Sequence, residues 1–174
     1  AYTLRSLFQT ENMHAQQQLK FAWSHSCRIA ATSYVLAKHM GTLNAERALL
    51  AGLIHEIGTT TLIKTAVKLE GTLNFDNDFR FIANELSGPI GAMVLRAWHF
   101  PDSMVEVVLE PESYQREPND KATLSDVVML AHYHDTQPPP WSESTPSADF
   151  LKQFPFLGED SFGENERLTI IDEA

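Results

Sequence analysis

The chain of 174 residues is 43% hydrophobic and 21% charged, a balance typical of a soluble globular domain with a sizeable core. Its 13 basic and 23 acidic residues give a formal net charge of -10, which disfavours binding to nucleic-acid phosphates or to anionic membrane surfaces. The apolar runs are shorter than the roughly 20 residues of a membrane span, and the one cysteine, Cys27, cannot form an internal disulfide, so we expect a cytoplasmic protein.

Apolar residues spaced by threes and fours predict a succession of helices. The first and longest, 13–40, contains neither Gly nor Pro and ends at Gly41, a residue suited to the left-handed position after a helix. Asn44 is expected to cap a second helix, which Gly58 closes. Further helices are predicted over 59–69, 79–86, 89–98, 103–108 and 119–135.

The breaks between these helices follow from glycine and proline. Residues 71–78 read as a loop, and Ser87-Gly88-Pro89 is expected to end one helix and to place Pro89 in the first turn of the next. Further breaks are predicted at Phe100-Pro101-Asp102 and at Glu110-Pro111-Glu112.

Beyond Asp135 the composition becomes rich in Pro and Ser. We therefore expect a helical domain over 1–136 and an irregular C-terminal extension over 137–174. Short amphipathic pieces over 150–156 and 165–171 carry aromatic or apolar residues that would dock the extension on the body. Since no segment alternates with the period of a strand, the predicted fold is an all-α, multi-helix bundle with an irregular tail.

His55-Glu56 is the pair of residues that best suggests chemistry. It lies at the end of an apolar helical run, just before Gly58, and imidazole and carboxylate are both ligands of first-row divalent metals. The bland alternative is a hydrogen-bonded polar junction between helices.

The other six histidines are weaker candidates. His25 falls on the buried side of the first helix, where a packed core histidine is the commoner role. His132 and His134 are two residues apart and point about 200° away from each other on a helix, so both cannot serve one site. The remaining three, near breaks or helix ends, are expected to be solvated or capping: His14, His39 and His99.

Other chemistries find no support in the sequence. It contains no Gly-rich phosphate loop, no Gly-x-Ser-x-Gly turn and no Cys-x-x-Cys pair. Cys27 follows Ser26 and precedes Arg28, but no base is apparent beside it, so a packing role is expected.

Three blocks of residues occur in a distinctive order. They are Trp23-Ser24-His25-Ser26 with Ala30, then Ala48-x-x-Ala51-Gly52-Leu53-Ile54-His55-Glu56-Ile57-Gly58, then Gly91-Ala92-x-x-Leu95-x-x-Trp98-x-x-Pro101. In residues, order and spacing they resemble the HDOD domain, the signalling output branch of the HD metal-dependent phosphohydrolase superfamily. The resemblance covers about residues 19–135. It implies an HD-like helical bundle in a bacterial signalling protein, and an upstream helical part that this chain would lack.

The resemblance also implies where an HD-type metal site would lie. HD hydrolases bind metal through an early His, the His-Asp pair and a late Asp. His25 matches the early His, and His55 with Glu56 matches the pair, with Glu in place of Asp. Ser87 stands where many relatives carry a further His, and His132 falls where the late Asp is expected.

Because the ligand set is altered, the predicted function is a non-catalytic regulatory module that binds a partner protein, other domains of a longer chain or a small ligand. We expect no metal or other cofactor. The alternative is a divergent metal-dependent phosphohydrolase acting on a nucleotide or cyclic dinucleotide. In that case a divalent transition metal would bind His25, His55, Glu56 and His132.

Overall fold

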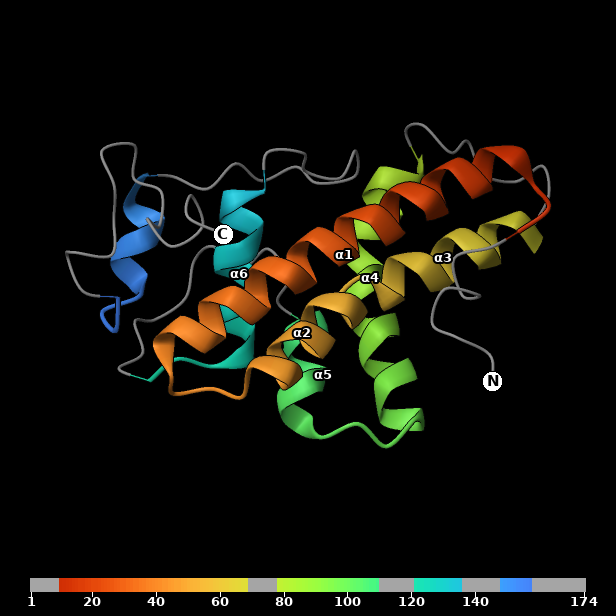
Figure 1. Cartoon of the computed structure of the whole chain (residues 1–174). Coiled ribbons are helices and arrows are strands. Elements are labelled where there is room, and N and C mark those ends of the chain that lie inside the picture. Colours follow the sequence, from red (N-terminus) through yellow and green to blue (C-terminus); the bar gives the residue numbers. More distant parts are fainter. Residues whose placement is uncertain (1–9, 69–77, 110–120, 136–147, 158–174) are drawn as a thin grey trace.

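The computed structural model describes residues 10–68, 78–109, 121–135 and 148–157, and these segments form the all-α bundle that the sequence predicts (Figure 1). None of the described segments contains a strand. The helices, in order, are α1 (Met13–Met40), α2 (Ala45–Ile54), α3 (Ile57–Lys68), α4 (Asp78–Ala97), α5 (Asp102–Leu109), α6 (Leu124–His134) and the 3₁₀ helix η2 (Ala148–Gln153).

The ends of α1 are set by local chemistry. The side chain of Asn12 accepts a hydrogen bond from the Ala15 N–H at the first turn. At the other end, Gly41 has a φ of 67° and donates its N–H to the carbonyl of Ala37. The predicted helix 13–40 and its glycine stop are thereby confirmed.

The junction of α2 and α3 differs from the prediction. Asn44 caps α2 as expected, but α2 ends at Ile54, and Gly58 lies inside the first turn of α3 instead of closing α2. A Cβ at Gly58 would lie 1.8 Å from the carbonyl oxygen of Ser87 on α4. Glycine is needed here because two helix backbones approach closely, and not because a helix stops.

The predicted break at Pro89 is wrong, since α4 runs through it without interruption. Two glycines bring the backbone of α4 close to Val108 on α5. A Cβ at Gly88 would lie 3.0 Å from the Val108 carbonyl oxygen, and one at Gly91 would lie 3.2 Å from the Val108 Cβ. Packing against α3 and α5 holds this segment helical despite the hydrogen bond that the proline removes.

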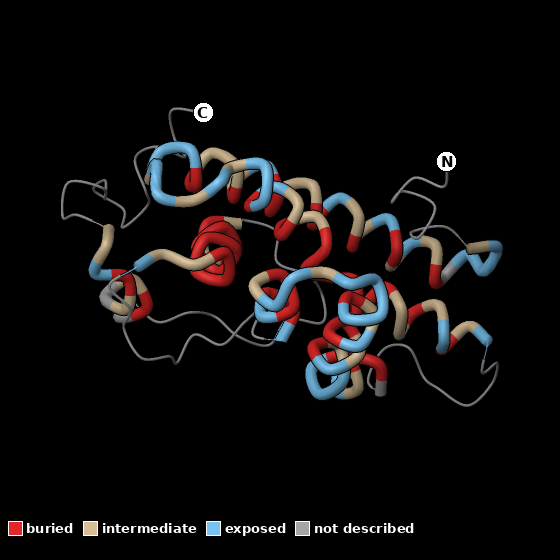
Figure 2. Tube along the Cα trace, turned by 90° about the horizontal axis from the view of Figure 1, so that it is seen from below, coloured by how far each residue is buried: buried red, intermediate tan, exposed pale blue. Residues whose placement is uncertain are grey.

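The helix α6 begins later than predicted. Thr123 and Asp126 form a capping box, in which the Asp126 carboxylate accepts from the Thr123 N–H and the Thr123 hydroxyl accepts from the Asp126 N–H. This fixes the start at Leu124. Apart from Tyr133, every residue of α6 is buried, and Figure 2 shows a helix that is red on nearly all sides.

The helix α6 is almost wholly buried against three other helices. α1 packs along α2, α3 continues the same row, and α6 contacts α1, α2 and α5 (Figure 1). Phe150 and Phe154 of the η2 region are buried in the same core cluster as Met129 and Leu130. No described helix combines the length and hydropathy that a membrane span requires.

Some predictions concern residues outside the described segments. These are the loop before Asp78, the break at 110–112, the Pro-rich stretch 137–147 and the piece 165–171. The division into a domain over 1–136 and an extension over 137–174 stays a prediction.

Candidate metal centre

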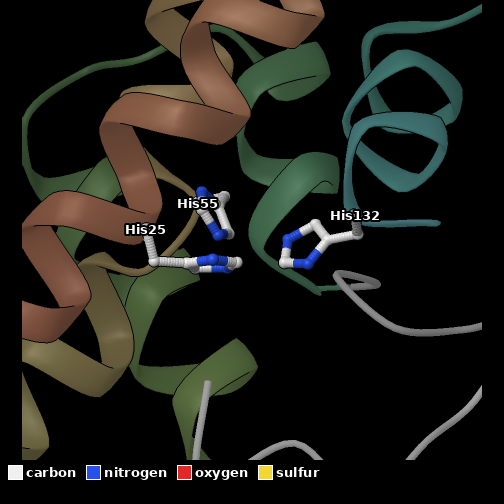
Figure 3. A group of neighbouring side chains, drawn as sticks. All are labelled: His25, His55 and His132. Carbon is white, nitrogen blue, oxygen red and sulfur yellow. The ribbon is translucent and has the colours of Figure 1, made fainter. Parts of the chain in front are cut away.

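Three histidines from three helices converge in the interior (Figure 3). His25 comes from the middle of α1, His55 from the C-terminal cap of α2, and His132 from the last turn of α6. The ring centroids of His25 and His55 lie 5.2 Å apart, those of His25 and His132 4.9 Å, and those of His55 and His132 4.7 Å. One nitrogen of each ring lies within 4.8 Å of the others.

A close helix contact brings two of these residues together. A Cβ at Gly52 of α2 would lie 2.5 Å from the Cα of Ala30 on α1, so the glycine allows α2 to approach the α1 backbone. His55 follows Gly52 by three residues, at the cap of α2, and His25 precedes Ala30 by five residues on α1. The Gly52 carbonyl also accepts a hydrogen bond of 2.6 Å from Nδ1 of His55.

Hydrogen bonds occupy Nδ1, the outer nitrogen, of His25 and His55 and leave their Nε2, the inner nitrogen, available. Nδ1 of His25 lies 2.8 Å from the Asp135 carboxylate, and Nδ1 of His55 binds a carbonyl; both partners only accept, so each Nδ1 carries the proton. Within the described residues, Nε2 of His25, His55 and His132 is buried without a hydrogen-bond partner. Binding of the outer ring N–H by a carboxylate or carbonyl is the usual support of a metal-ligating histidine.

Burial keeps His55 and His132 neutral. Burial lowers the pKa of His55 to about 4, against a smaller opposing effect of the Glu56 carboxylate. Burial also holds the pKa of His132 well below its usual value, and the nearby His55 and His25 lower it further. Neutral imidazoles at pH 7 have free lone pairs, which metal binding requires.

The spacing fits one ion after small adjustments. Two nitrogens bound at about 2.1 Å to a tetrahedral ion lie about 3.4 Å apart, and the widest separation one ion can bridge is about 4.2 Å. The nitrogens here lie within 4.8 Å of one another, so rotations that draw the rings in by up to about an ångström would suffice. The residues present therefore fit a transition metal.

Glu56 lies at the edge of the cluster. Its Oε1 is 3.9 Å from Nε2 of His55, the nitrogen without a hydrogen-bond partner, and its side chain is buried. A carboxylate on this side can act as a fourth ligand or bind a metal-bound water. Of the predicted site residues, the structure thus groups His25, His55 and His132, and it places Glu56 beside His55.

Two residues at the site were not predicted from the sequence. Asp135 bonds to His25, and Arg28 binds the same carboxylate through two hydrogen bonds of 3.0 Å, Nε to Oδ1 and Nη2 to Oδ2. The signal available in the sequence was spacing: Arg28 follows His25 by three residues, and Asp135 follows His132 by three. Residues three apart share a helix face. The sequence does not indicate, however, which face of one helix packs against which face of another.

The remaining candidates lie elsewhere. Ser87 sits on α4, where its carbonyl approaches Gly58, outside the histidine cluster. His39 and His99 are exposed, as predicted, and the side chain of His14 is outside the described part of the chain. His134 is buried and its ring meets that of Tyr133 edge-on at 5.0 Å.

Comparison with a solved structure supports an HD-like helical bundle as the fold. A crystal structure from Shewanella amazonensis, of a protein provisionally named a metal-dependent phosphohydrolase, matches with a TM-score of 0.70 and 22% sequence identity. The match covers 86% of this chain and 53% of that one, so the chain spans about half the length of that protein. At this identity the likeness shows the fold alone.

The family model for the HDOD domain matches residues 1–114, and the chain belongs to this family. No curated protein sequence matches the chain. His25, His55 and Glu56 fall within the family match, whereas His132 and Asp135 follow it along the chain. The third histidine of the cluster therefore comes from a helix beyond the matched residues.

Proposed function

We propose that this chain is a regulatory HDOD module of the bacterial cytoplasm in which His25, His55 and His132 bind one divalent transition metal. The metal would fix α1, α2 and α6 in the arrangement that a partner protein, another domain or a small ligand recognises. Two observations carry the proposal: one nitrogen of each ring lies within 4.8 Å of the others, and the Nε2 atom of each ring is buried without a hydrogen-bond partner among the described residues.

A metal accounts for these nitrogens better than a polar junction does. A junction that merely ties helices together should satisfy its polar atoms, because each buried unpaired group costs roughly 1–3 kcal/mol. Here three such atoms belong to rings that each bring one nitrogen within 4.8 Å of the others. An ion bound to all three would remove that cost, which is why the geometry now favours a metal although the altered motif led us to expect none.

The donor set limits the choice of ion. Imidazole nitrogens with one carboxylate suit Zn, Fe or Ni, and three protein ligands leave a position for water or a fourth ligand. Magnesium and calcium, which prefer oxygen ligands, do not fit three imidazoles. Zinc is therefore an ion to test in a binding experiment, and cobalt serves as its coloured substitute.

Burial supports a regulatory role over turnover. The exposed fractions of His25, His55 and His132 are 0%, 4% and 9%, whereas a hydrolytic metal has to reach both water and substrate. Arg28, whose Nη2 lies 3.4 Å from Nδ1 of His25, is bound to the carboxylate of Asp135. The chain is acidic overall, so phosphate groups would find little compensation.

A second candidate function is hydrolysis of a phosphoester, such as a nucleotide or cyclic dinucleotide. Three ligands leave an open coordination position, and the Shewanella relative carries the name of a metal-dependent phosphohydrolase. In that function the metal would supply an activated water, and Glu56, beside the inner nitrogen of His55, is the residue placed to hold its proton.

Metal binding is tested by elemental analysis of protein purified without chelator and by titration of metal-free protein with Co²⁺, whose visible absorption reports its coordination geometry. We expect one ion per chain in the wild type and near-zero occupancy in His55→Ala and His132→Ala. His39→Ala removes an exposed imidazole and is the matched control, with full occupancy. Absence of stoichiometric metal in the wild type, after reconstitution, would refute the proposal.

The two candidate functions differ in what the loaded protein does. If the protein is a regulatory module, metal binding should slow hydrogen exchange in α1, α2 and α6. The metal-loaded protein should then leave the test substrate bis(p-nitrophenyl) phosphate unhydrolysed. Metal-dependent turnover that is lost in Glu56→Gln, with metal still bound, would instead establish the hydrolase.

A further inference from the structure

The carboxylate of Asp135 joins two of the three helices that form the histidine cluster. Asp135 is the cap residue after α6, and its N–H donates to the carbonyl of His132 at 3.1 Å. Its side chain, 6% exposed, crosses to α1 and lies 2.8 Å from Nδ1 of His25. One residue therefore contacts the backbone of one candidate ligand and the ring of another.

Arg28 holds this carboxylate from the solvent side. It makes two parallel hydrogen bonds of 3.0 Å to the two oxygens of Asp135, and its Nη1 donates to the Ser24 hydroxyl at 3.2 Å. The Arg28 side chain is 33% exposed. Such a two-point contact fixes the plane of the carboxylate, which a single point charge would not do.

We propose that Asp135, fixed by Arg28, is a positioning residue that sets His25 in the tautomer with the proton on Nδ1, so that the Nε2 lone pair points into the cluster. This inference rests on the proposed metal site and assigns the residues that prepare it. The pair also couples α1 to α6, because Asp135 reaches His25 from the end of the helix that carries His132.

The geometry distinguishes between the two tautomers. If Nδ1 of His25 were unprotonated, its lone pair would face a carboxylate oxygen only 2.8 Å away, which is repulsive. Its other neighbour, Nη2 of Arg28, lies 3.4 Å away and donates at 3.0 Å to Asp135. The shorter contact to an acceptor therefore decides the tautomer. A carboxylate in this position also makes the imidazole a stronger donor to a metal.

Asp135→Asn tests the assignment with little change of shape. An amide offers both an acceptor and a donor, so it can bond to either tautomer of His25 and no longer selects one. We expect the metal-free wild type to show only the Nδ1–H form of His25 in long-range proton–nitrogen NMR spectra. In the variant the Nε2–H form should be populated, and Zn²⁺ affinity should fall about 10- to 100-fold, the usual effect of losing such a partner.

Arg28→Lys keeps the charge and removes the two-point contact. We expect a mixture of tautomers and a smaller loss of Zn²⁺ affinity, of less than 10-fold. Arg47→Lys is the matched control, since Arg47 is an exposed arginine of α2 that bonds to Ser103, and it should change neither readout. Thermal unfolding of each variant establishes that it is folded.

The NMR readout separates the two proposals, because it needs no metal. A wild type with Nε2–H on His25, or an Asp135→Asn protein that keeps both its tautomer and its affinity, would overturn the positioning role. If the wild type shows the Nδ1–H tautomer but binds no metal, the proposed function fails while the positioning of His25 stands.

Discussion

Replacing Gly58 by alanine should destabilise the bundle at the contact between α3 and α4. The added Cβ would lie 1.8 Å from the carbonyl oxygen of Ser87, 2.7 Å from its carbonyl carbon and 2.9 Å from the backbone nitrogen of Gly91. Real Cβ atoms essentially never come within 3.0 Å of another heavy atom, so the two helices would have to separate by about 1.2 Å. No side chain can rotate to relieve this contact, because all three obstructing atoms belong to the backbone.

The expected loss follows from two opposing effects. Inserting a methyl group into a well-packed core typically lowers the free energy of unfolding by about 1–3 kcal/mol. We expect about 3 kcal/mol at Gly58, because the obstructing atoms are backbone atoms that cannot rotate away. Alanine regains about 1 kcal/mol through its higher helix propensity. The net loss of about 2 kcal/mol corresponds to a fall in Tm of about 4–8 °C for a protein of this size.

Thermal unfolding followed by circular dichroism measures this shift, and Gly88→Ala provides the control. At Gly88 the nearest atom to the added Cβ is the Val108 carbonyl oxygen at 3.0 Å, so the tight contact and the gain in helix propensity should nearly cancel. We expect its Tm to stay within about 3 °C of the wild type. A Gly58→Ala protein as stable as the wild type would refute the close-approach explanation.

Three further predictions concern the metal-free protein. The pKa of His55 is about 4 in the folded protein and 6.5 in the unfolded chain, so the unfolded chain takes up the proton first as pH falls. The free energy of unfolding should therefore be at its full value above about pH 6.5 and fall by about 3 kcal/mol towards pH 4. Urea unfolding should show a smaller pH dependence in His55→Asn. Phe150→Ala should cost about 3–5 kcal/mol in urea unfolding, since this ring is fully buried and stacks on Tyr133 with centroids 5.3 Å apart; an unchanged midpoint would contradict docking of this segment on the core. Thr123→Ala should remove about 1 kcal/mol by breaking the capping box of α6, and hydrogen exchange should be faster in the first turn of that helix than in its last.

Local signals in the sequence were sufficient for helices whose ends depend on neighbouring residues. The start of α2 at Asn44 and the stop of α1 at Gly41 could be predicted because a side chain or a glycine there completes the backbone hydrogen bonds of the same helix. Gly58 and Pro89 could not be interpreted in this way. The role of Gly58 depends on its contact with α4, and Pro89 stays helical because α4 packs against α3 and α5. These contacts form only when the chain folds.

The sequence by itself determined that this protein is an all-α bundle of the HDOD family and singled out His25, His55, Glu56 and His132, because helical periodicity and motif spacing are properties of the chain alone. Only the tertiary structure decided that the three imidazoles lie together in the interior, and that Asp135, held by Arg28, bonds to the ring of His25. The physical reason is that metal binding depends on the direction of lone pairs. Those directions are set by helix crossings between residues about 30 to 110 positions apart, which no local pattern encodes.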